Sequence, residues 1–182
     1  MRLIDRTGGA ETPAERPEEA LTLLSEGEAS TAALGERLGR EATGGEVIAL
    51  IGPLGAGKTR FVQGLARGLD VPIRYVNSPT FILLQCHEGR LPLYHIDLYR
   101  LERAAEFEAL GLEEFLEGDG VCAVEWADKG LALLPPARLT ATFRYAGEGR
   151  REIDLSAVGE GYIQWLQKIK EERRWEIAEK KK

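Results

Sequence analysis

The stretch "VIALIGPLGAGKTRFV", residues 47–62, decides the fold because it joins an apolar run to a glycine-rich loop and a helix. Val47–Ile51 is a short continuous apolar run, as in a strand that is covered on both faces. After the loop, apolar side chains recur on one side of a helix that we expect from Lys58 to about Leu69. This order of strand, loop and helix predicts an α/β protein with a phosphate-binding loop.

The loop itself matches the pattern G-x-x-x-x-G-K-[ST] through Gly52, Gly57, Lys58 and Thr59. Glycines let several backbone N–H groups turn toward one phosphate chain, and Gly55 adds another point of close approach. The start of the helix contributes a partial positive charge. Lys58 offers a charge to the β- and γ-phosphates, and Thr59 offers a hydroxyl to Mg²⁺. The loop alone predicts ATP or GTP binding and does not indicate which class of nucleotide-binding protein this is.

Two carboxylates are set in apolar strands, where a charge is costly unless it is engaged. Glu125 ends the run "VCAVEW" and Asp97 lies in "YHIDLYR". We assign Glu125 to Mg²⁺, directly or through water, and Asp97 to the attacking water or the metal shell. Which carboxylate ligates the metal stays open, and Arg100 is an alternative, structural partner for Asp97. By strand alternation, Trp126 is expected on the face opposite Glu125, in the core.

The segment "NSPTF" adds a candidate switch. Pro79 fixes the backbone and biases Ser78 to an extended form, so Thr80 could present its hydroxyl to a γ-phosphate or metal. Such a loop can order with a triphosphate and relax after hydrolysis. The alternative is a plain entry turn into a hairpin formed by Thr80–Cys86 and Leu91–Leu98.

Size and composition fit one globular domain, with 182 residues, 43% hydrophobic and 30% charged. No apolar run approaches the roughly 20 residues of a membrane helix, and the N-terminus lacks the apolar core of a secretory signal. We therefore expect a cytoplasmic protein that does not enter a membrane. Two cysteines and two histidines make a disulfide framework or a zinc site improbable.

The expected fold class is α/β, with a P-loop NTPase-like mixed sheet flanked by helices in a single domain, and a C-terminal helical extension. We expect a flexible arm at residues 1–18, the ATPase domain at 19–158 and a charged helix at 159–182. The remaining expected elements are a helix from Glu28 to about Arg40, a broken helix in the acidic segment 102–120, a strand at "GVCAVEW", and two strands about Gly147 and Gly149.

Charge is distributed unevenly along the chain. The net charge is −6, which argues against general nucleic-acid binding by the body. Residues 168–182 carry seven basic and four acidic side chains, and Ile163, Leu166 and Ile169 share one face of the expected last helix. The basic end could touch tRNA or a partner subunit, and the alternative is a solvated, fraying helix.

Taken together, "GPLGAGKTRF", "SPTF", "HIDLYRL" and "VEWAD" resemble the TsaE (YjeE) family over about Leu21 to Asp154. The resemblance implies a small bacterial ATPase of tRNA threonylcarbamoyladenosine synthesis that uses ATP and Mg²⁺. It also implies two partner subunits, TsaD and TsaB, whose threonylcarbamoyl-transfer complex is turned over with the help of ATP hydrolysis. Contact with tRNA is then indirect, through that complex.

Carried over by residue, the resemblance assigns catalytic roles to Lys58, Thr80 and Asp97, and metal binding to Thr59 and Glu125. An E-x-x-T stretch, Glu28 and Thr31, is placed near the nucleotide base. The implied ATP-binding loop positions are Gly52, Gly55, Ala56, Gly57, Lys58, Thr59 and Arg60.

The sequence departs from the family pattern in two places. "EWAD" stands where the family commonly has a proline after the tryptophan, and the helix after about Gly159 extends beyond the usual end of the family. Two other classes compete with the ATPase. A small-molecule kinase usually carries an arginine-rich lid, but the arginines here are scattered. A GTP switch usually carries N-K-x-D, to which "ADKG" is the nearest match.

Overall fold

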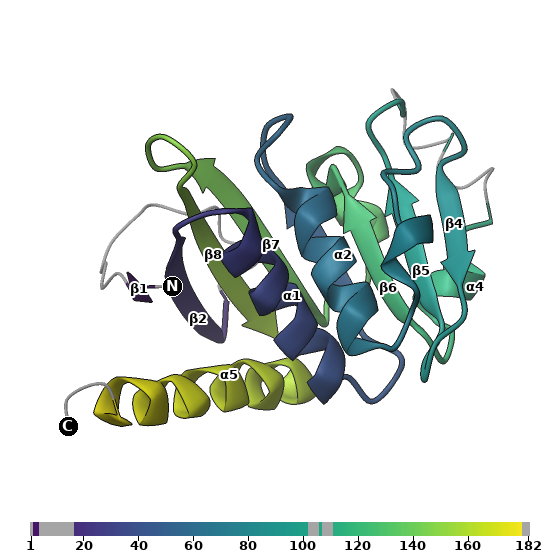
Figure 1. Ribbon diagram of the computed structural model, residues 1–182. Coiled ribbons are helices and arrows are strands. Elements are labelled where there is room, and N and C mark those ends of the chain that lie inside the picture. Colours follow the sequence, from purple (N-terminus) through teal and green to yellow (C-terminus); the bar gives the residue numbers. More distant parts are fainter. Residues whose placement is uncertain (1, 4–16, 102–105, 107–110, 180–182) are drawn as a thin grey trace.

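A mixed sheet runs through the molecule and carries two helices side by side on one face (Figure 1). The computed structural model describes residues 2–3, 17–101, 106 and 111–179. Eight strands in this part of the chain are ordered β1-β2-β8-β7-β3-β6-β5-β4. Their bounds are β1 Arg2–Leu3, β2 Glu19–Ser25, β3 Val47–Ile51, β4 Leu84–His87, β5 Leu93–Asp97, β6 Val121–Glu125, β7 Arg138–Tyr145 and β8 Arg151–Val158.

The helices are short except for the last. They are α1 Glu28–Glu41, α2 Lys58–Gly68, α4 Glu113–Leu116 and α5 Glu160–Glu179, with 3-10 turns at Ile73–Tyr75, Ala127–Lys129 and Leu131–Leu133. The expected α/β class with a mixed sheet and a C-terminal helix is confirmed. Among the described residues, no helix combines the length and apolarity needed to cross a bilayer.

The centre of the sheet is parallel and its flanks are antiparallel. β3 pairs in parallel with β6 and β7, and β6 pairs in parallel with β5. In this register Leu50 lies opposite Glu125, and Glu125 lies opposite Asp97. Because parallel strands end at the same edge, the β3 loop and both carboxylates come together there.

β3 is buried on both faces, as its continuous apolar run predicts. Ile48 and Leu50 join the core beneath α1 and α2, whereas Val47 and Ala49 join a second core on the opposite face. The period of two along the strand divides these side chains between the layers.

α1 and α2 approach each other closely because glycine stands at their contact. A Cβ atom on Gly64 of α2 would lie 1.9 Å from the Ala32 carbonyl oxygen, and one on Gly35 of α1 would lie 2.1 Å from the Phe61 carbonyl oxygen. Neither position has room for a side chain, so the helix pair depends on both glycines.

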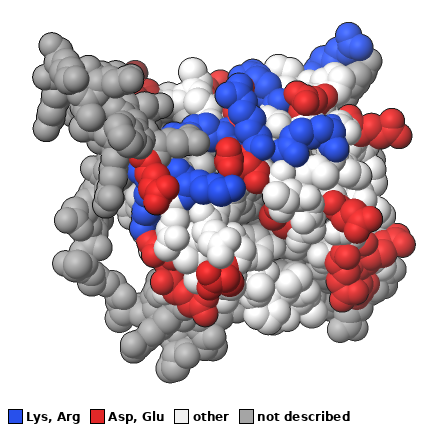
Figure 2. All heavy atoms as spheres, turned by 90° about the horizontal axis from the view of Figure 1, so that it is seen from below, with Lys and Arg blue, Asp and Glu red and all other residues white. Residues whose placement is uncertain are grey.

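α5 crosses the lower end of α1, β2 and β8 in Figure 1. Trp165, Leu166 and Ile169 are buried against the main core, and the Tyr162 hydroxyl accepts a hydrogen bond of 2.8 Å from the Val47 N–H. The first half of this helix is therefore docked. On the described part of the face seen from below, Lys and Arg side chains are interspersed with Asp and Glu (Figure 2).

The expected hairpins are confirmed, with shifted limits. β4 and β5 pair antiparallel, but β4 begins at Leu84 and not at Thr80, because residues 80–83 form a turn. β7 and β8 form the second expected hairpin. Residues 102–105 and 107–110 of the expected acidic helix lie outside the described residues, as do residues 4–16 of the expected arm. Within that arm, Arg2–Leu3 pairs with β2, a strand that the sequence did not predict.

Candidate functional site

A cavity of about 430 Å³ opens beside the glycine loop, where the loop joins β3 to α2. The predicted residues that line it are Glu28, Gly55, Gly57, Lys58, Thr59, Arg60, Ser78, Thr80 and Glu125. Leu54, Gln63, Tyr99, Trp126 and Arg151 complete the lining. Asp97 lies behind Ser78 and Thr80, to which it is hydrogen bonded. The structure thus brings the four sequence motifs to one place.

The loop takes a backbone path that favours glycine. Gly55 and Gly57 have φ of 75° and 104°, and Gly57 is the N-cap of α2. The Lys58 ammonium is buried and donates to the carbonyl oxygens of Gly52 at 2.7 Å and Pro53 at 3.0 Å. Burial lowers the pKa of Lys58 below its usual value, while the charges of Glu125, Asp97 and Asp128 oppose that shift.

Glu125 is the buried carboxylate nearest the start of α2. Its Oε1 accepts a hydrogen bond of 2.8 Å from the Thr59 hydroxyl and lies 2.9 Å from Nε2 of His95. His95 is fully buried on β5, so its contact with Oε1 holds the carboxylate from within the protein interior. The hydroxyl and the carboxylate oxygen therefore converge at the helix start, as the assignment of both to Mg²⁺ requires.

Asp97 is fully buried and holds the segment that carries Thr80. Its Oδ2 accepts hydrogen bonds from the Ser78 hydroxyl at 2.5 Å and the Thr80 hydroxyl at 2.7 Å, and its Oδ1 accepts from the Tyr99 N–H at 2.8 Å. Arg100, considered as an alternative partner, lies over the Phe81 ring with 4.3 Å between guanidinium carbon and ring centroid. Asp97 thus connects the candidate switch to the end of β5.

The E-x-x-T pair is divided between the rim and the interior. Glu28 forms an ion pair of 2.6 Å with Arg60 at the cavity rim. Thr31 is buried, and its hydroxyl lies 2.7 Å from that of Ser25. The Thr31 methyl is 3.6 Å from the place that a Cβ on Gly57 would occupy, so Thr31 packs beneath the loop.

Trp126 meets the expectation drawn from strand alternation only in part, because its ring packs against the second core but is not enclosed by it. β6 ends at Glu125, and Trp126 takes a left-handed backbone conformation with φ of 57°. Its half-buried ring lines the cavity, with the Lys58 ammonium 4.0 Å from the ring centroid. Alternation did not predict this second contact, because it holds only while the chain stays extended and β6 ends at Glu125. Ala127, which replaces the family's proline, is buried in the turn that follows.

Two side chains that the sequence analysis did not select support the loop. Arg151, the first residue of β8, donates from Nε to the Ala56 carbonyl oxygen at 2.9 Å. The Tyr145 hydroxyl, at the end of β7, donates to the Leu54 carbonyl oxygen at 2.5 Å. Because β7 pairs in parallel with β3, the β7–β8 turn lies beside the loop, although about ninety residues separate them in the sequence.

The donor set fits Mg²⁺ held together with a nucleotide. Mg²⁺ is usually held by one or two carboxylates plus phosphate oxygens, without an all-protein cage. In the described part of the chain, no group of three or more His, Cys, Asp or Glu side chains could hold a metal by itself. Thr59 and Glu125 supply oxygen ligands of the preferred kind at the helix start.

The central parallel sheet, the glycine loop and the helix that follows define an α/β protein of the P-loop class. The family model described as "Threonylcarbamoyl adenosine biosynthesis protein TsaE" matches residues 25–153, more than half of the chain. The chain therefore belongs to the TsaE family, as the sequence resemblance indicated.

Individual relatives agree with this assignment. The tRNA threonylcarbamoyladenosine biosynthesis protein TsaE of Bacillus subtilis is 50% identical over 119 residues, covering 65% of this chain and 73% of the relative. The protein of that name from Treponema pallidum is 43% identical over 126 residues, covering 69% and 93%. The crystal structure of Bacillus subtilis YdiB superposes with a TM-score of 0.75 at 36% identity, covering 85% of this chain and 97% of that one.

Proposed function

We propose that this TsaE-family chain is a Mg²⁺-dependent ATPase subunit of the machinery that makes threonylcarbamoyladenosine in tRNA. Its ATP hydrolysis supports turnover of a threonylcarbamoyl-transfer complex formed by TsaD-like and TsaB-like subunits in the cytoplasm. The observation that carries the proposal is the convergence of Lys58, Thr59 and Glu125 at one cavity, with the Thr80–Asp97 pair beside it.

Each residue has a role that its position favours. The loop N–H groups and Lys58 hold the phosphates, and because burial disfavours its charge, the ammonium gains from a phosphate partner. Thr59 and Glu125 hold Mg²⁺, which when bound neutralises charge that develops on the phosphate oxygens. Thr80 and Asp97 position the attacking water and sense the γ-phosphate.

The rim of the cavity supports the docking of a partner subunit. Leu54 of the loop, Phe81 of the switch segment and Ile82, which follows that segment, are 76%, 81% and 62% exposed. Leu54 lines the cavity, and Phe81 and Ile82 follow Thr80, which also lines it. Large apolar side chains exposed in this way favour a surface that another protein covers. A partner bound there would contact both the loop and the segment that changes with the γ-phosphate, so hydrolysis and partner binding would be coupled.

Substitution of Lys58 tests the proposal. Purified protein should hydrolyse ATP slowly alone and faster with TsaD-like and TsaB-like subunits. Lys58→Ala should abolish both rates, and cells relying on that variant should lose threonylcarbamoyladenosine from tRNA. Lys170→Ala, which removes a lysine on α5, is the matched control. Normal tRNA modification with Lys58→Ala would overturn the proposal, and phosphate transfer to a metabolite would favour a kinase instead.

A further inference from the structure

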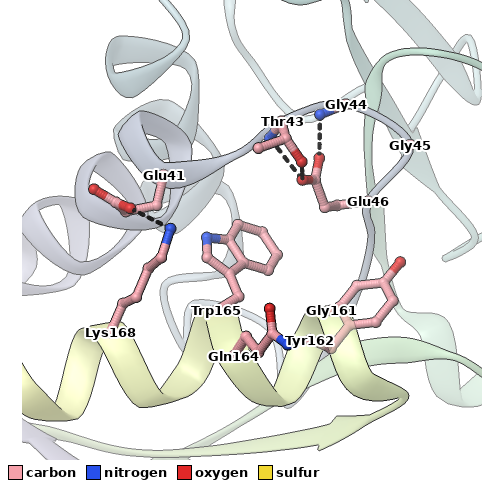
Figure 3. Close-up of a pocket in the computed structure, with 10 residues that line it drawn as sticks. All are labelled: Glu41, Thr43, Gly44, Gly45, Glu46, Gly161, Tyr162, Gln164, Trp165 and Lys168. Atoms are coloured by element: carbon pink, nitrogen blue, oxygen red, sulfur yellow. Dashed lines mark hydrogen bonds and ion pairs between the residues drawn. The ribbon is translucent and has the colours of Figure 1, made fainter.

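A second cavity, of about 310 Å³, lies between the first turns of α5 and the connection from α1 to β3. We call it the basal cavity. Its lining includes Glu41, Glu46, Tyr162, Trp165 and Lys168 (Figure 3). Tyr162, Trp165 and Lys168 come from α5, beyond residues 25–153 that the family model matches. The basal cavity opens beside the start of β3, whereas the nucleotide loop follows the end of that strand.

One end of the basal cavity offers hydrogen-bond donors. Trp165 is 5% exposed, and its indole N–H finds no acceptor among the described residues. A buried donor without an acceptor is unfavourable, so an acceptor at this point is strongly favoured. The indole nitrogen lies on the side of its ring that faces Lys168 (Figure 3).

Lys168 can serve the same acceptor. Its ammonium forms an ion pair of 3.1 Å with Glu41, with the two side chains 55% and 33% exposed. Exposed pairs of this kind are weak, so the lysine can turn to a competing anion. A carboxylate could accept from the Trp165 N–H and the Lys168 ammonium together.

The other side of the basal cavity carries a negative charge, Glu46, for which the described residues supply no ion-pair partner. Glu46 accepts hydrogen bonds from the Thr43 N–H at 2.7 Å, the Thr43 hydroxyl at 3.0 Å and the Gly44 N–H at 2.9 Å. These donors are neutral, so they fix the carboxylate in place without cancelling its charge. In Figure 3 this carboxylate lies across the indole ring from Lys168 and Glu41. With Glu41 and Glu46 against Lys168, a purely anionic ligand is disfavoured.

We propose that the basal cavity binds a small dipolar ligand of the basic α-amino acid class. Its carboxylate accepts hydrogen bonds from Trp165 and Lys168, and its cationic side chain pairs with Glu46. The aliphatic chain of the ligand lies along the indole ring between them. The cavity volume is near the lower limit for small-molecule sites, which suits a ligand of this size.

The test is an NMR titration of the full-length protein with L-arginine, observed at the Trp165 indole ¹H–¹⁵N resonance. We expect a saturable downfield shift with a Kd of about 1 mM or tighter, while the Trp126 indole beside Lys58 stays unchanged. Agmatine, which lacks the carboxylate, and citrulline, which lacks the charge, should each bind about tenfold more weakly. No saturable shift by about 10 mM arginine, or equal binding of the three compounds, would overturn the proposal.

Two variants test which residue binds each end of the ligand, with binding followed by the Gly44 and Gly45 amide resonances. Trp165→Phe should weaken arginine binding about tenfold and leave agmatine binding unchanged. Glu46→Gln should weaken arginine binding by a similar factor and leave citrulline binding unchanged. If Trp165→Phe loses its folded spectrum, Lys168→Met replaces it and should likewise weaken arginine binding without changing agmatine binding. Variants that bind arginine as the parent does would refute the assignment.

A last comparison identifies the source of the ligand. A short peptide that ends in a C-terminal arginine carries the same carboxylate and guanidinium as the free amino acid. Tighter binding of this peptide would assign the basal cavity to a protein C-terminus, and tighter binding of free arginine would assign it to a metabolite. Both results support the shared chemistry, and failure of both probes would exclude it.

Discussion

Arg151 shows how one side chain can set the shape of a distant loop. Its hydrogen bond to the Ala56 carbonyl ties the loop to the first residue of β8. We expect Arg151→Ala to weaken ATP binding by about tenfold, because the loop loses a charge-assisted hydrogen bond that orders it. Isothermal titration with ATP and Mg²⁺ measures this.

The neighbouring arginine provides the control for that experiment. Arg150 is exposed in the β7–β8 turn and its side chain lies near Gly147, away from the loop. Arg150→Ala should bind ATP as the parent protein does. Equal affinities of the Arg151→Ala variant and the parent would show that the loop is ordered without this contact.

The two cysteines should differ sharply in reactivity. Burial raises the pKa of Cys122, and burial followed by the charge of Glu114 raises the pKa of the exposed Cys86 thiol. The thiolate is the reactive form, so native protein should label once, at Cys86, and faster as the pH rises toward the pKa of that thiol. Counting labelled thiols by mass spectrometry, with and without denaturant, checks this.

The raised thiol pKa values also fix the sign of a pH effect on stability. The folded state retains these protons to higher pH than the unfolded state, so their contribution is fully present below the unfolded pKa of about 8.5 and declines above it. Cys122→Ala should flatten this alkaline decline in urea unfolding. Labelling of Cys122 at the same rate as Cys86 would contradict the burial of Cys122.

The contact between α1 and α2 gives a prediction at the level of elements. Alanine usually stabilises a helix relative to glycine by about 1 kcal/mol. At Gly64 the sign should reverse, because the new Cβ would meet the Ala32 carbonyl oxygen at 1.9 Å and force the helices apart. We expect Gly64→Ala to lower the free energy of unfolding by about 1–3 kcal/mol. Chemical denaturation measures the change.

A second helical glycine serves as the matched control. Gly161 in α5 has nothing within 4 Å of the place where its Cβ would stand. Gly161→Ala should therefore be neutral or slightly stabilising. A Gly64→Ala variant as stable as Gly161→Ala would mean that the helix pair relaxes at little cost.

The elements that the sequence predicted correctly are those with strong local signals. A continuous apolar run predicts β3, and the glycine loop before α2 predicts the start of that helix. β2 was missed because its pairing with β8 is non-local. The place of Trp126 in the cavity lining was missed because the strand pattern ends at this left-handed residue. Nothing in the sequence around Arg151 predicts its contact with the loop, because only the order of strands in the sheet brings β8 to the loop. Residue types thus indicated the carboxylates and the loop as candidates. The side chains that support the loop, such as Arg151, could not be predicted because their contacts depend on tertiary structure.

For the whole molecule, the first half of α5 is part of the core. Ending the chain after Val158 would remove Trp165, Leu166 and Ile169, each worth about 1.5–3 kcal/mol when buried. Because domains are stable by only about 5–15 kcal/mol, we expect this truncation to unfold the protein or to lower its Tm by more than about 10 °C. Calorimetry distinguishes these outcomes.

A shorter truncation separates stability from binding. Ending the chain after Glu171 keeps Trp165, Leu166 and Ile169 and removes the rest of the basic segment, so we expect the Tm to change little. This variant also tests whether the basic end touches tRNA or a partner subunit, because its affinities can be compared with those of the parent at equal stability. A large loss of Tm in this variant would mean that α5 docks along its whole length.

The pairing of β2 with β8 also has a consequence during synthesis on the ribosome. Thr22 and Asp154 face each other across this pair, 132 residues apart in the chain. At about 5–20 residues per second, β2 is synthesised roughly 7 to 26 seconds before its partner strand. Throughout that interval the apolar side of β2, with Leu21 and Leu23, has no β8 to pair with, so nascent chains are most prone to aggregate then. Slowing translation ahead of residue 150 should therefore lower the soluble yield.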